Sequence, residues 1–320
     1  MILAGDLGGT NARLALYDGR GKRRIVEKTY AARDFRSAAQ VIRTFLDDHP
    51  GAKPLRASLG IAGPVHAGVC VATNLPWVVD ARKLARAFSW EKVALHNDMI
   101  ALAWGCAVSA PSDACILHGS KTPSIKSGVV GVVAPGTGLG ECYLVPTSGH
   151  TVGMPTEGGH ADFAPRNEEE SALLAYAQSQ FGRVSTERIL CGDGLGLVHR
   201  FVQSHLGLVD GEASQATHAD PNKRVVALAQ TGAPAARKAV QMFASMLGAE
   251  LGNVALRGLT RGGVFLSGSL GAAVVGLERE AVLSAYFAKG RFQEFLASVS
   301  LTLVARTDVG LDGSARLALV

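Results

Sequence analysis

The sequence predicts an α/β fold of two domains with mixed sheets. A chain of 320 residues can bury a large core, and this length favours two domains. Three expected strands and a helix come first, and strands then alternate with helices, an order typical of α/β layers with a mixed sheet. A glycine-rich turn between two apolar strands occurs at the N-terminus and again near residue 135, which indicates a repeated unit, although short glycine motifs also recur by chance.

The N-terminal hairpin is predicted by apolar runs at Ile2–Ala4 and Leu14–Tyr17 on either side of a polar turn. The turn supplies glycines that permit positive φ and polar groups that can bind an anion: Gly5, Gly8, Gly9, Thr10 and Asn11. Asp6 would repel an anion unless a cation such as Mg²⁺ lay between them. We therefore expect a site for Mg²⁺ and phosphate, the alternative being an ordinary hairpin tip.

The remaining elements of the first domain follow from apolar periodicity and capping residues. Ser37 is expected to cap a helix that buries Val41, Ile42 and Phe45 on one face. In order, we expect a strand at Arg24–Tyr30, a helix from Ser37 to about Asp48, strands at Pro54–Val65 and Gly68–Ala72, a helix capped by Asp80, and a strand at Lys92–Leu95.

The second domain is expected to begin near the polar, turn-rich stretch Pro111–Lys121. Its predicted elements are strands at Val129–Ala134 and Glu141–Val145 around the turn Pro135–Gly140, helices at Glu170–Phe181 and Ala235–Leu256, a strand at Gly263–Leu266 and a turn at Ser267–Gly271. Gly248 and Gly252 would let the second helix pack closely against a neighbour. The C-terminal tail can belong to either domain.

Composition and charge exclude several classes of protein. A hydrophobic content of 48% with 18% charged residues is typical of a folded chain and not of a disordered one. The net charge is +5, but the only dense basic run, Lys22-Arg23-Arg24, lies at an expected turn, which favours a solvated turn over nucleic-acid binding. The five scattered cysteines indicate reduced thiols and no zinc site. Without a signal-peptide pattern or a long apolar run, we expect a cytoplasmic protein with no membrane partner.

Three glycine-rich turns that each follow an apolar strand are expected to surround a nucleoside triphosphate in a cleft between the domains. The second turn offers Gly136, Thr137 and Gly138, and the third contains Gly268. The second turn lacks the lysine of a P-loop and does not match the dinucleotide fingerprint. The similar stretch Gly192–Gly196 is expected to begin a helix instead.

Asn97 and Asp98 follow an expected strand, which is the usual place for a functional carboxylate in an open α/β sheet. Phosphoryl transfer to an alcohol needs an acceptor for the hydroxyl proton, a role open to Asp98, while Asn97 can hold a neighbouring hydroxyl. The alternative is that Asp98 only caps the helix that follows.

Glu157, His160 and Glu187 add planar groups of the kind that bind vicinal sugar hydroxyls. Each alone is more often structural, and Glu187 also fits a capping box. Glu157 and His160 could imitate a zinc pair, but no third ligand is indicated. Trp77 is expected in the core and not as a platform for a sugar ring.

A series of segments, in order over nearly the whole chain, resembles the bacterial ATP-dependent glucokinases, a branch of the actin-like, hexokinase-type (ribonuclease H-like) ATPase superfamily. They are GDLGGTNARLAL (5–16), GIAGPV (60–65), TNLPW (73–77), HND (96–98), APGTGLG (134–140), EGGHADFAPRNEEE (157–170), ERILCGDGL (187–195), GGVFLSGSL (262–270) and GLDGSARL (310–317). The resemblance implies transfer of the γ-phosphoryl group of Mg-ATP to the 6-hydroxyl of glucose, the first step of glycolysis. It also implies a small domain (1–109 and 300–320) and a large domain (110–299) that close over glucose, and a homodimer.

The resemblance assigns roles to individual residues as well. Asp98 becomes the general base. The expected sugar-binding residues are Asn97, Asp98, Glu157, His160, Glu187, Gly63 and Pro64. The expected ATP-binding residues are Gly5, Asp6, Leu7, Gly8, Gly9, Thr10, Asn11, Gly136, Thr137, Gly138 and Gly268, with Asp6 holding Mg²⁺ directly or through water.

The sequence departs from the family pattern in places, and other functions also fit it. The zinc-binding cysteine–histidine motif of the related repressor and kinase branch is absent, which implies no zinc, and GDGL stands where SGPGL is more usual. A kinase for mannose, N-acetylglucosamine or another hexose is an alternative, because the sequence does not fix the surroundings of C2. A silent sugar sensor or transcriptional regulator would carry a helix-turn-helix and lose the base, and an actin-like filament protein would not need the Glu157–His160 cluster.

Overall fold

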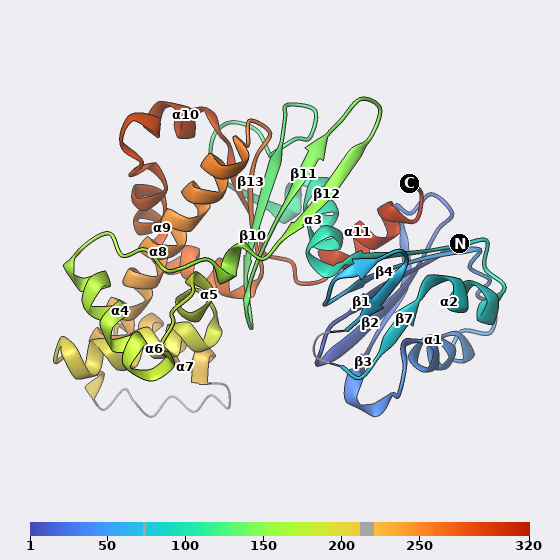
Figure 1. Cartoon of the computed structure of the whole chain (residues 1–320), viewed down its shortest axis with the longest axis horizontal. Coiled ribbons are helices and arrows are strands. Elements are labelled where there is room, and N and C mark those ends of the chain that lie inside the picture. The colour runs from blue at the N-terminus through green and yellow to red at the C-terminus, as the bar shows by residue number, and fades with distance from the viewer. Residues whose placement is uncertain (73–74, 212–220) are drawn as a thin grey trace. The chain divides into compact units, whose positions relative to one another are not determined.

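The computed structural model describes residues 1–72, 75–211 and 221–320, with side chains in the last range described from residue 223 (Figure 1). Thr73 and Asn74 of the TNLPW segment lie outside these residues. Two compact units are formed. The first contains Met1–Ala110, Thr151–Pro155 and Thr307–Val320, and the second contains Pro111–His150 and Thr156–Arg306.

A mixed five-stranded sheet in the order β3-β2-β1-β4-β8 forms the centre of the first unit. Its strands are β1 (Ile2–Leu7), β2 (Asn11–Tyr17), β3 (Arg24–Ala31), β4 (Arg56–Ile61) and β8 (Lys92–Asn97). β1, β2 and β3 form an antiparallel meander, and β4 and β8 run parallel to β1. Since β1 is central, the turn that follows it lies at the same sheet edge as the C-terminal ends of β4 and β8.

Helices cover both faces of this sheet, because alternate residues of β1 point to opposite sides. Leu3 and Leu7 belong to the same core cluster as Phe45 of α1, whereas Ile2 packs with Leu311 of α11. The helices are α1 (Ala38–Asp47), α2 (Ala81–Phe88), α3 (Asp98–Val108) and α11 (Val309–Leu317), with the short η1 (Ala32–Asp34). A small antiparallel sheet contains β5 (Val65–His66), β6 (Val69–Val71) and β7 (Val78–Asp80).

In the first unit, the predicted helices and strands are present, but several begin or end at other residues than expected. Ser37 caps α1 by accepting a hydrogen bond from the N–H of Gln40, and Asp80 caps α2. The strand expected from Pro54 is β4, which ends at Ile61, and the chain then turns at Gly63, whose φ is +150°, within the turn expected at Gly60–Val65.

In the second unit, the strands of the main sheet follow the order β11-β10-β13-β14-β9. They are β9 (Ala114–His118), β10 (Val130–Pro135), β11 (Leu139–Pro146), β13 (Gly263–Ser267) and β14 (Leu301–Val304), and β12 (Thr151–Thr156) follows β11 in the chain. β10 is antiparallel to β11 and parallel to β13, just as β1 is antiparallel to β2 and parallel to β4. The repeated strand–turn–strand unit expected from the sequence is therefore present.

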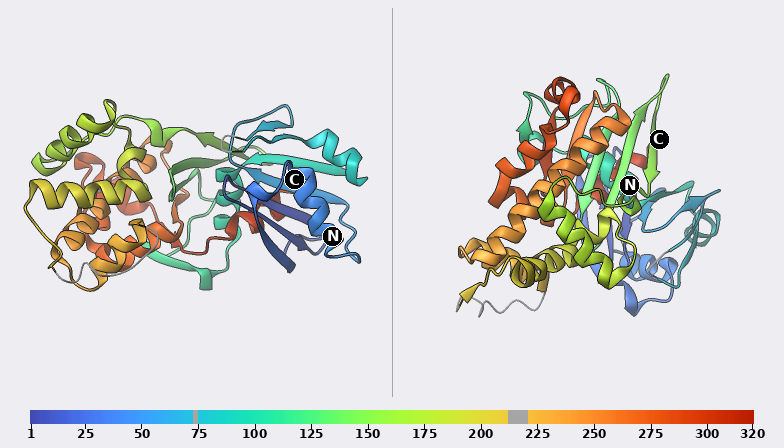
Figure 2. Two further views of the ribbon diagram at one scale, coloured as in Figure 1. Left: turned by 90° about the horizontal axis from the view of Figure 1, so that it is seen from below. Right: turned by 60° about the vertical axis from the view of Figure 1, so that its left-hand side comes forward.

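Helices of the second unit pack around α8, whose 25 residues form much of the core. The helices are α4 (Glu168–Phe181), α5 (Thr186–Ile189), α6 (Gly192–His205), α7 (Pro221–Gln230), α8 (Pro234–Gly258), α9 (Ser269–Phe287) and α10 (Gln293–Ser298), with the short η2 (Pro111–Asp113), η3 (Gly158–His160) and η5 (Gly290–Phe292). α8 and α9 lie side by side (Figures 1 and 2). A Cβ at Gly248 would lie 2.0 Å from the carbonyl oxygen of Val282, so this glycine is required by the close approach.

The observed division of the chain differs from the expected one in two places. Leu301–Arg306 belong to the second unit because β14 pairs with β13 and β9. The short stretch Thr151–Pro155 groups with the first unit. The tail therefore contributes to both units, with β14 in the second and α11 in the first.

Candidate active site

The turn between β1 and β2 is closed by a hydrogen bond of 3.0 Å from the N–H of Gly8 to the carbonyl of Asn11. Glycine permits a positive φ, but Gly5, Gly8 and Gly9 are not among the described glycines that have one. Position 5 needs glycine for packing instead, since a Cβ there would lie 2.5 Å from Leu59 Cδ2. Glycine here serves the sheet and not a ligand.

Three other members of the expected phosphate loop differ in accessibility. Leu7 is fully buried in the core, so only its main chain could contact a ligand. Thr10 and Asn11 are exposed at the tip, where their side chains are free to approach phosphate oxygens. Thr10 and Asn11 are thus the most accessible part of this loop, and Gly8 and Gly9 beside them are partly exposed.

Asp6 lies at the base of the turn, opposite Arg13 in the β1–β2 register. The pKa of Asp6 is raised to about 6, chiefly by burial, which outweighs the opposing Arg13 guanidinium 3.9 Å away, and the charge of Asp98 adds a smaller rise. The side chain nevertheless remains 29% exposed. A recessed carboxyl whose charged form is disfavoured gains from a divalent cation, which restores that form. Asp6 is therefore chemically suited to Mg²⁺.

Asn97 and Asp98 occupy the junction of β8 and α3. The N-cap of α3 is Asn97, whose Oδ1 accepts a hydrogen bond of 3.0 Å from the N–H of Met99, and Asp98 is the first helical residue. Asp98 Oδ1 accepts from the same N–H over 2.9 Å. Asn97 Nδ2 donates to the carbonyl of Gly63 over 3.4 Å, and the neighbouring Pro64 is exposed. Asp98 thus lies where the helix dipole favours a carboxylate.

η3 and α5 bring together the sugar-binding candidates of the second unit. His160 Nε2 lies 3.9 Å from Glu157 Oε2 and 3.8 Å from Glu187 Oε1. The N–H of Thr186 donates to the carbonyl of Ala161 over 2.8 Å, which attaches the start of α5 to the end of η3. The Glu157 side chain is 87% exposed and that of Glu187 only 28%, so the group forms an open polar surface with Glu187 at its base.

Glu187 also supports the glycine-rich turn between β10 and β11. Its Oε2 accepts a hydrogen bond of 2.8 Å from the N–H of Leu139. A Cβ at Gly138 would lie 2.4 Å from the same oxygen, so the carboxylate occupies the space that a side chain would need. Glu187 does not close a capping box, because the N-cap Ser185 bonds Arg188 through its own side chain and Glu187 bonds the turn.

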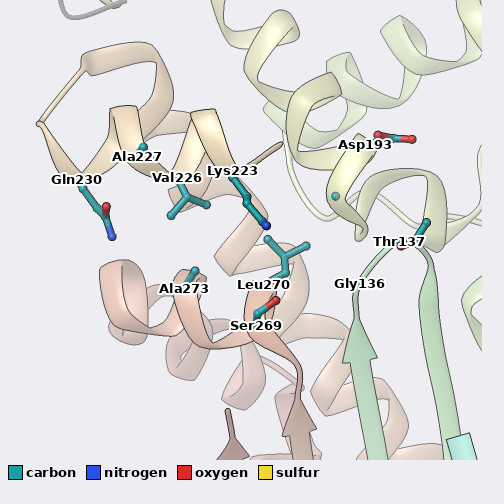
Figure 3. A pocket seen from close by; sticks show the side chains of 11 residues that line it. Gly136, Thr137, Asp193, Lys223, Val226, Ala227, Gln230, Ser269, Leu270 and Ala273 are labelled. Atoms are coloured by element: carbon teal, nitrogen blue, oxygen red, sulfur yellow. The ribbon is translucent and has the colours of Figure 1, made fainter. Parts of the chain in front are cut away.

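A cavity of about 550 Å³ opens beside this turn within the second unit (Figure 3). Its lining comes from the turn and from α6, α7 and α9: Gly136, Thr137, Gly192, Asp193, Lys223, Val226, Ala227, Gln230, Ser269, Leu270 and Ala273. The N–H of Gly192 donates to the carbonyl of Gly136 over 2.8 Å, which fixes the turn against the start of α6. An apolar cavity of this volume with a few polar groups is typical of a small-molecule site.

The sequence located only part of this cavity. Gly136 and Thr137 line it, and Gly268, with φ of +99°, directly precedes Ser269 at its wall. The contribution of α7, with Lys223 and Gln230, was missed because that helix carries no glycine motif. Gly192 begins α6 as expected, but the same segment lines the cavity as well.

One other alternative left open by the sequence is settled by burial and bonding. Trp77 is 1% exposed and its Nε1 donates to the carbonyl of Phe35 over 3.1 Å, as expected for a core residue. Across residues 1–72, 75–211 and 221–320, no group of three or more His, Cys, Asp and Glu side chains could hold a metal ion. Within the same ranges, no helix is both long and apolar enough to span a membrane.

Comparison with known proteins agrees with this geometry. A family model described as Glucokinase matches residues 3–319. The glucokinase of Xanthomonas euvesicatoria pv. vesicatoria (strain 85-10) is 32% identical, over 99% of this chain and 94% of its own. A glucokinase structure from an Antarctic psychrotroph has a TM-score of 0.85 at 27% identity, over 99% of this chain and 98% of the other. The structure of Balamuthia mandrillaris glucokinase in complex with glucose has a TM-score of 0.80 at 22% identity, over 100% and 93%.

These likenesses confirm the fold class expected from the sequence, the actin-like, hexokinase-type α/β fold with mixed sheets.

Proposed function

Because the chain belongs to the Glucokinase family, we propose that it transfers the γ-phosphoryl group of Mg-ATP to the 6-hydroxyl of glucose. The observation that best supports this is the double contact of Glu187. One carboxylate oxygen lies 3.8 Å from His160, and the other bonds Leu139 in the glycine-rich turn beside the 550 Å³ cavity. A single side chain thus joins a polar, sugar-type surface to a nucleotide-sized pocket.

Asp98 is the general base of this proposal. It accepts the proton of the 6-hydroxyl as the oxygen attacks the γ-phosphorus, and the bond to the leaving ADP oxygen breaks. Asn97 binds a neighbouring hydroxyl through its amide while its Oδ1 caps α3, which keeps the pair in fixed register. Gly63 and Pro64 complete this side of the sugar, with the Gly63 carbonyl held by Asn97.

Glu157, His160 and Glu187 are the other sugar-binding residues of this proposal. Carboxylates accept hydrogen bonds from hydroxyls, and the imidazole can donate or accept according to its tautomer. The exposure of Glu157 and His160, with side chains 87% and 58% exposed, supports this role, because a ligand can reach them from solvent.

The ATP-binding residues fall into two sets. The 550 Å³ cavity takes the nucleoside, with Gly136, Thr137, Gly138 and Gly268 at its phosphate end. The tip of the β1–β2 turn, at Gly8–Asn11, binds phosphate oxygens through main-chain N–H groups and the side chains of Thr10 and Asn11. Asp6 would hold Mg²⁺ directly or through water, and the bound ion neutralises phosphate charge.

The proposed setting is a cytoplasmic homodimer that catalyses the first step of glycolysis, without zinc, a membrane or a nucleic-acid partner. The odd number and scattered positions of the five cysteines support a reducing compartment. The family membership supports the assembly, which size-exclusion chromatography with light scattering would measure.

A coupled assay for hexose 6-phosphate, with purified protein, Mg-ATP and a panel of sugars, tests the function. We expect turnover with glucose well above that with mannose, fructose or N-acetylglucosamine. Turnover confined to another hexose would reassign the substrate. Thermal stabilisation by sugar without turnover on any hexose would make the protein a sensor and refute the kinase.

A further inference from the structure

One buried acid is left without a role by the proposed mechanism. Glu141 lies on β11, opposite Val133 of β10, and only 2% of the residue is exposed. Its Oε1 has no hydrogen-bond partner among the described residues, and its Oε2 lies 3.6 Å from Arg257 Nη1. A buried carboxyl with one bare oxygen is costly unless it is uncharged, so its presence in the core needs an explanation.

The carboxyl lies directly beneath the turn that carries Glu157 and His160. A Cβ at Gly158 would lie 2.2 Å from Glu141 Oε2, so the carboxyl fills the space below this glycine. Thr156 makes a second connection between Glu141 and Gly158. Its hydroxyl donates to the main-chain carbonyl of Glu141 over 3.0 Å and accepts from the N–H of Gly158 over 3.2 Å.

The neighbouring positions on β11 support the other half of the same surface. A Cβ at Gly159 would lie 2.4 Å from the carbonyl oxygen of Leu139, and the N–H of Leu139 holds Glu187. Leu139 and Glu141 are on the same face of β11, since alternate residues share a face. The two residues therefore form the floor on which the Glu157–His160 turn rests.

The charged groups that act on Glu141 come from α8. α8 presents Glu250 and Arg257 to it, and these two are paired at 2.6 Å. Tyr143 is the titratable neighbour on its own strand, and Thr156 and Gly158 are uncharged. Glu141 and Glu250 thus both face the Arg257 guanidinium. Glu250 is also bound by Asn253, which accepts a hydrogen bond from Lys289. Burial first, and then the Glu250 carboxylate, hold the pKa of Glu141 well above its usual range against the opposing effect of Arg257.

We propose that Glu141, in its uncharged form, is a positioning residue that holds the Glu157–His160 turn in the geometry that binds glucose. This inference rests on the proposed function, because it assumes that Glu157 and His160 contact the sugar. Loss of the proton places a second negative charge beside Glu250 in a buried space. The carboxylate then moves toward Arg257, and the support beneath Gly158 is lost.

Steady-state kinetics of Glu141→Gln across a pH series tests the proposal. The amide has the shape of the protonated acid and cannot ionise. We expect the KM for glucose to rise with pH in the wild type and to stay flat in Glu141→Gln, with kcat and the KM for ATP unchanged at the lower pH. Glu141→Leu should raise the glucose KM about fivefold at low pH, the effect of one lost buried polar contact, and Glu141→Gln should keep the low wild-type value. At high pH the difference between Glu141→Leu and the wild type should shrink, because the ionised wild type has lost the same support.

A matched control and a second variant keep the test decisive. Glu170→Gln alters another buried acid of the same unit, which lies on α4 and is paired with Arg166, and should leave the glucose pH profile unchanged. Thr156→Val removes the hydroxyl bridge while keeping side-chain shape, and should raise the glucose KM without flattening the pH dependence. Equal pH profiles in the wild type and Glu141→Gln would overturn the proposal. Absence of glucose turnover in the wild type would instead refute the proposed function.

Discussion

Gly105 of α3 and Gly313 of α11 lie in direct contact, so that a Cβ at Gly313 would lie 2.5 Å from the main-chain nitrogen of Gly105. α11 is also tied to β1, because Ser314 Oγ donates to the carbonyl of Gly5 over 3.0 Å. The last helix of the chain therefore packs between the strand that leads to Asp6 and the helix that begins with Asp98.

Gly105→Ala should destabilise the protein, because the new Cβ would lie 1.9 Å from the carbonyl oxygen of Val309, a main-chain atom that cannot rotate away. Overpacking of this kind costs about 1–3 kcal/mol. Thermal or urea unfolding measures the loss. Gly19→Ala is the control, because a Cβ there meets nothing within 4 Å. Equal stability of Gly105→Ala and the wild type would show that the helices do not touch as described.

Asp98→Asn should lower kcat by about 10²–10⁴-fold, the usual contribution of a general base, and leave ATP binding intact. Asparagine keeps the size of the side chain and its place at the start of α3, so folding is retained. The coupled assay gives kcat, and calorimetry gives ATP affinity. Asp47→Asn changes an exposed aspartate at the end of α1 and should have no effect on either quantity. Near-normal turnover of Asp98→Asn would remove Asp98 from the mechanism.

Glu187→Ala should raise the KM for both substrates, because the carboxylate binds the sugar surface with one oxygen and the Leu139 N–H with the other. A hydrogen bond to a charged group contributes about 1.5–3 kcal/mol, which corresponds to at least a tenfold effect. The His160→Ala variant keeps the bond between Glu187 and Leu139 in the β10–β11 turn, so it should raise only the KM for glucose.

Glu280→Ala, at an exposed position on α9, is the control for the loss of a glutamate. If Glu187→Ala changed the KM for glucose alone, the bond between Glu187 and Leu139 would not contribute to ATP binding.

The sequence predicted the site best where chemistry depends on short local patterns. Asn97 and Asp98 follow a strand and begin a helix, and the pair Glu157 and His160 is separated by two glycines, so both patterns are visible without a structure. The bond from Leu139 to Glu187 was invisible, because it joins residues 48 positions apart whose meeting depends on how α5 packs. The 550 Å³ cavity was only partly predictable for the same reason, since Lys223 and Gln230 come from α7, a helix without a recognisable sequence motif.

Ala273→Phe should weaken ATP binding by about tenfold or more, because a ring would fill the part of the 550 Å³ cavity that Ala273 lines. Glucose binding should be unchanged, which sugar-dependent thermal stabilisation can measure. Ser284→Phe introduces the same ring on an exposed position of the same helix and is the matched control. Unaltered ATP affinity in Ala273→Phe would place the nucleotide elsewhere.

Glu141→Gln should make the protein more stable than the wild type at high pH and no more stable at low pH. The folded-state pKa of Glu141 lies above its unfolded value, because burial and Glu250 disfavour the carboxylate. The folded protein therefore keeps a proton that the unfolded chain releases, and the free energy of unfolding falls as pH rises through the interval between the two values. Each unit of pKa difference corresponds to about 1.4 kcal/mol at most, and glutamine removes this loss. Melting temperatures of both proteins over a pH series, with Glu170→Gln alongside, measure it. A stability gap that did not widen with pH would show that Glu141 is ionised in the folded protein at all these values.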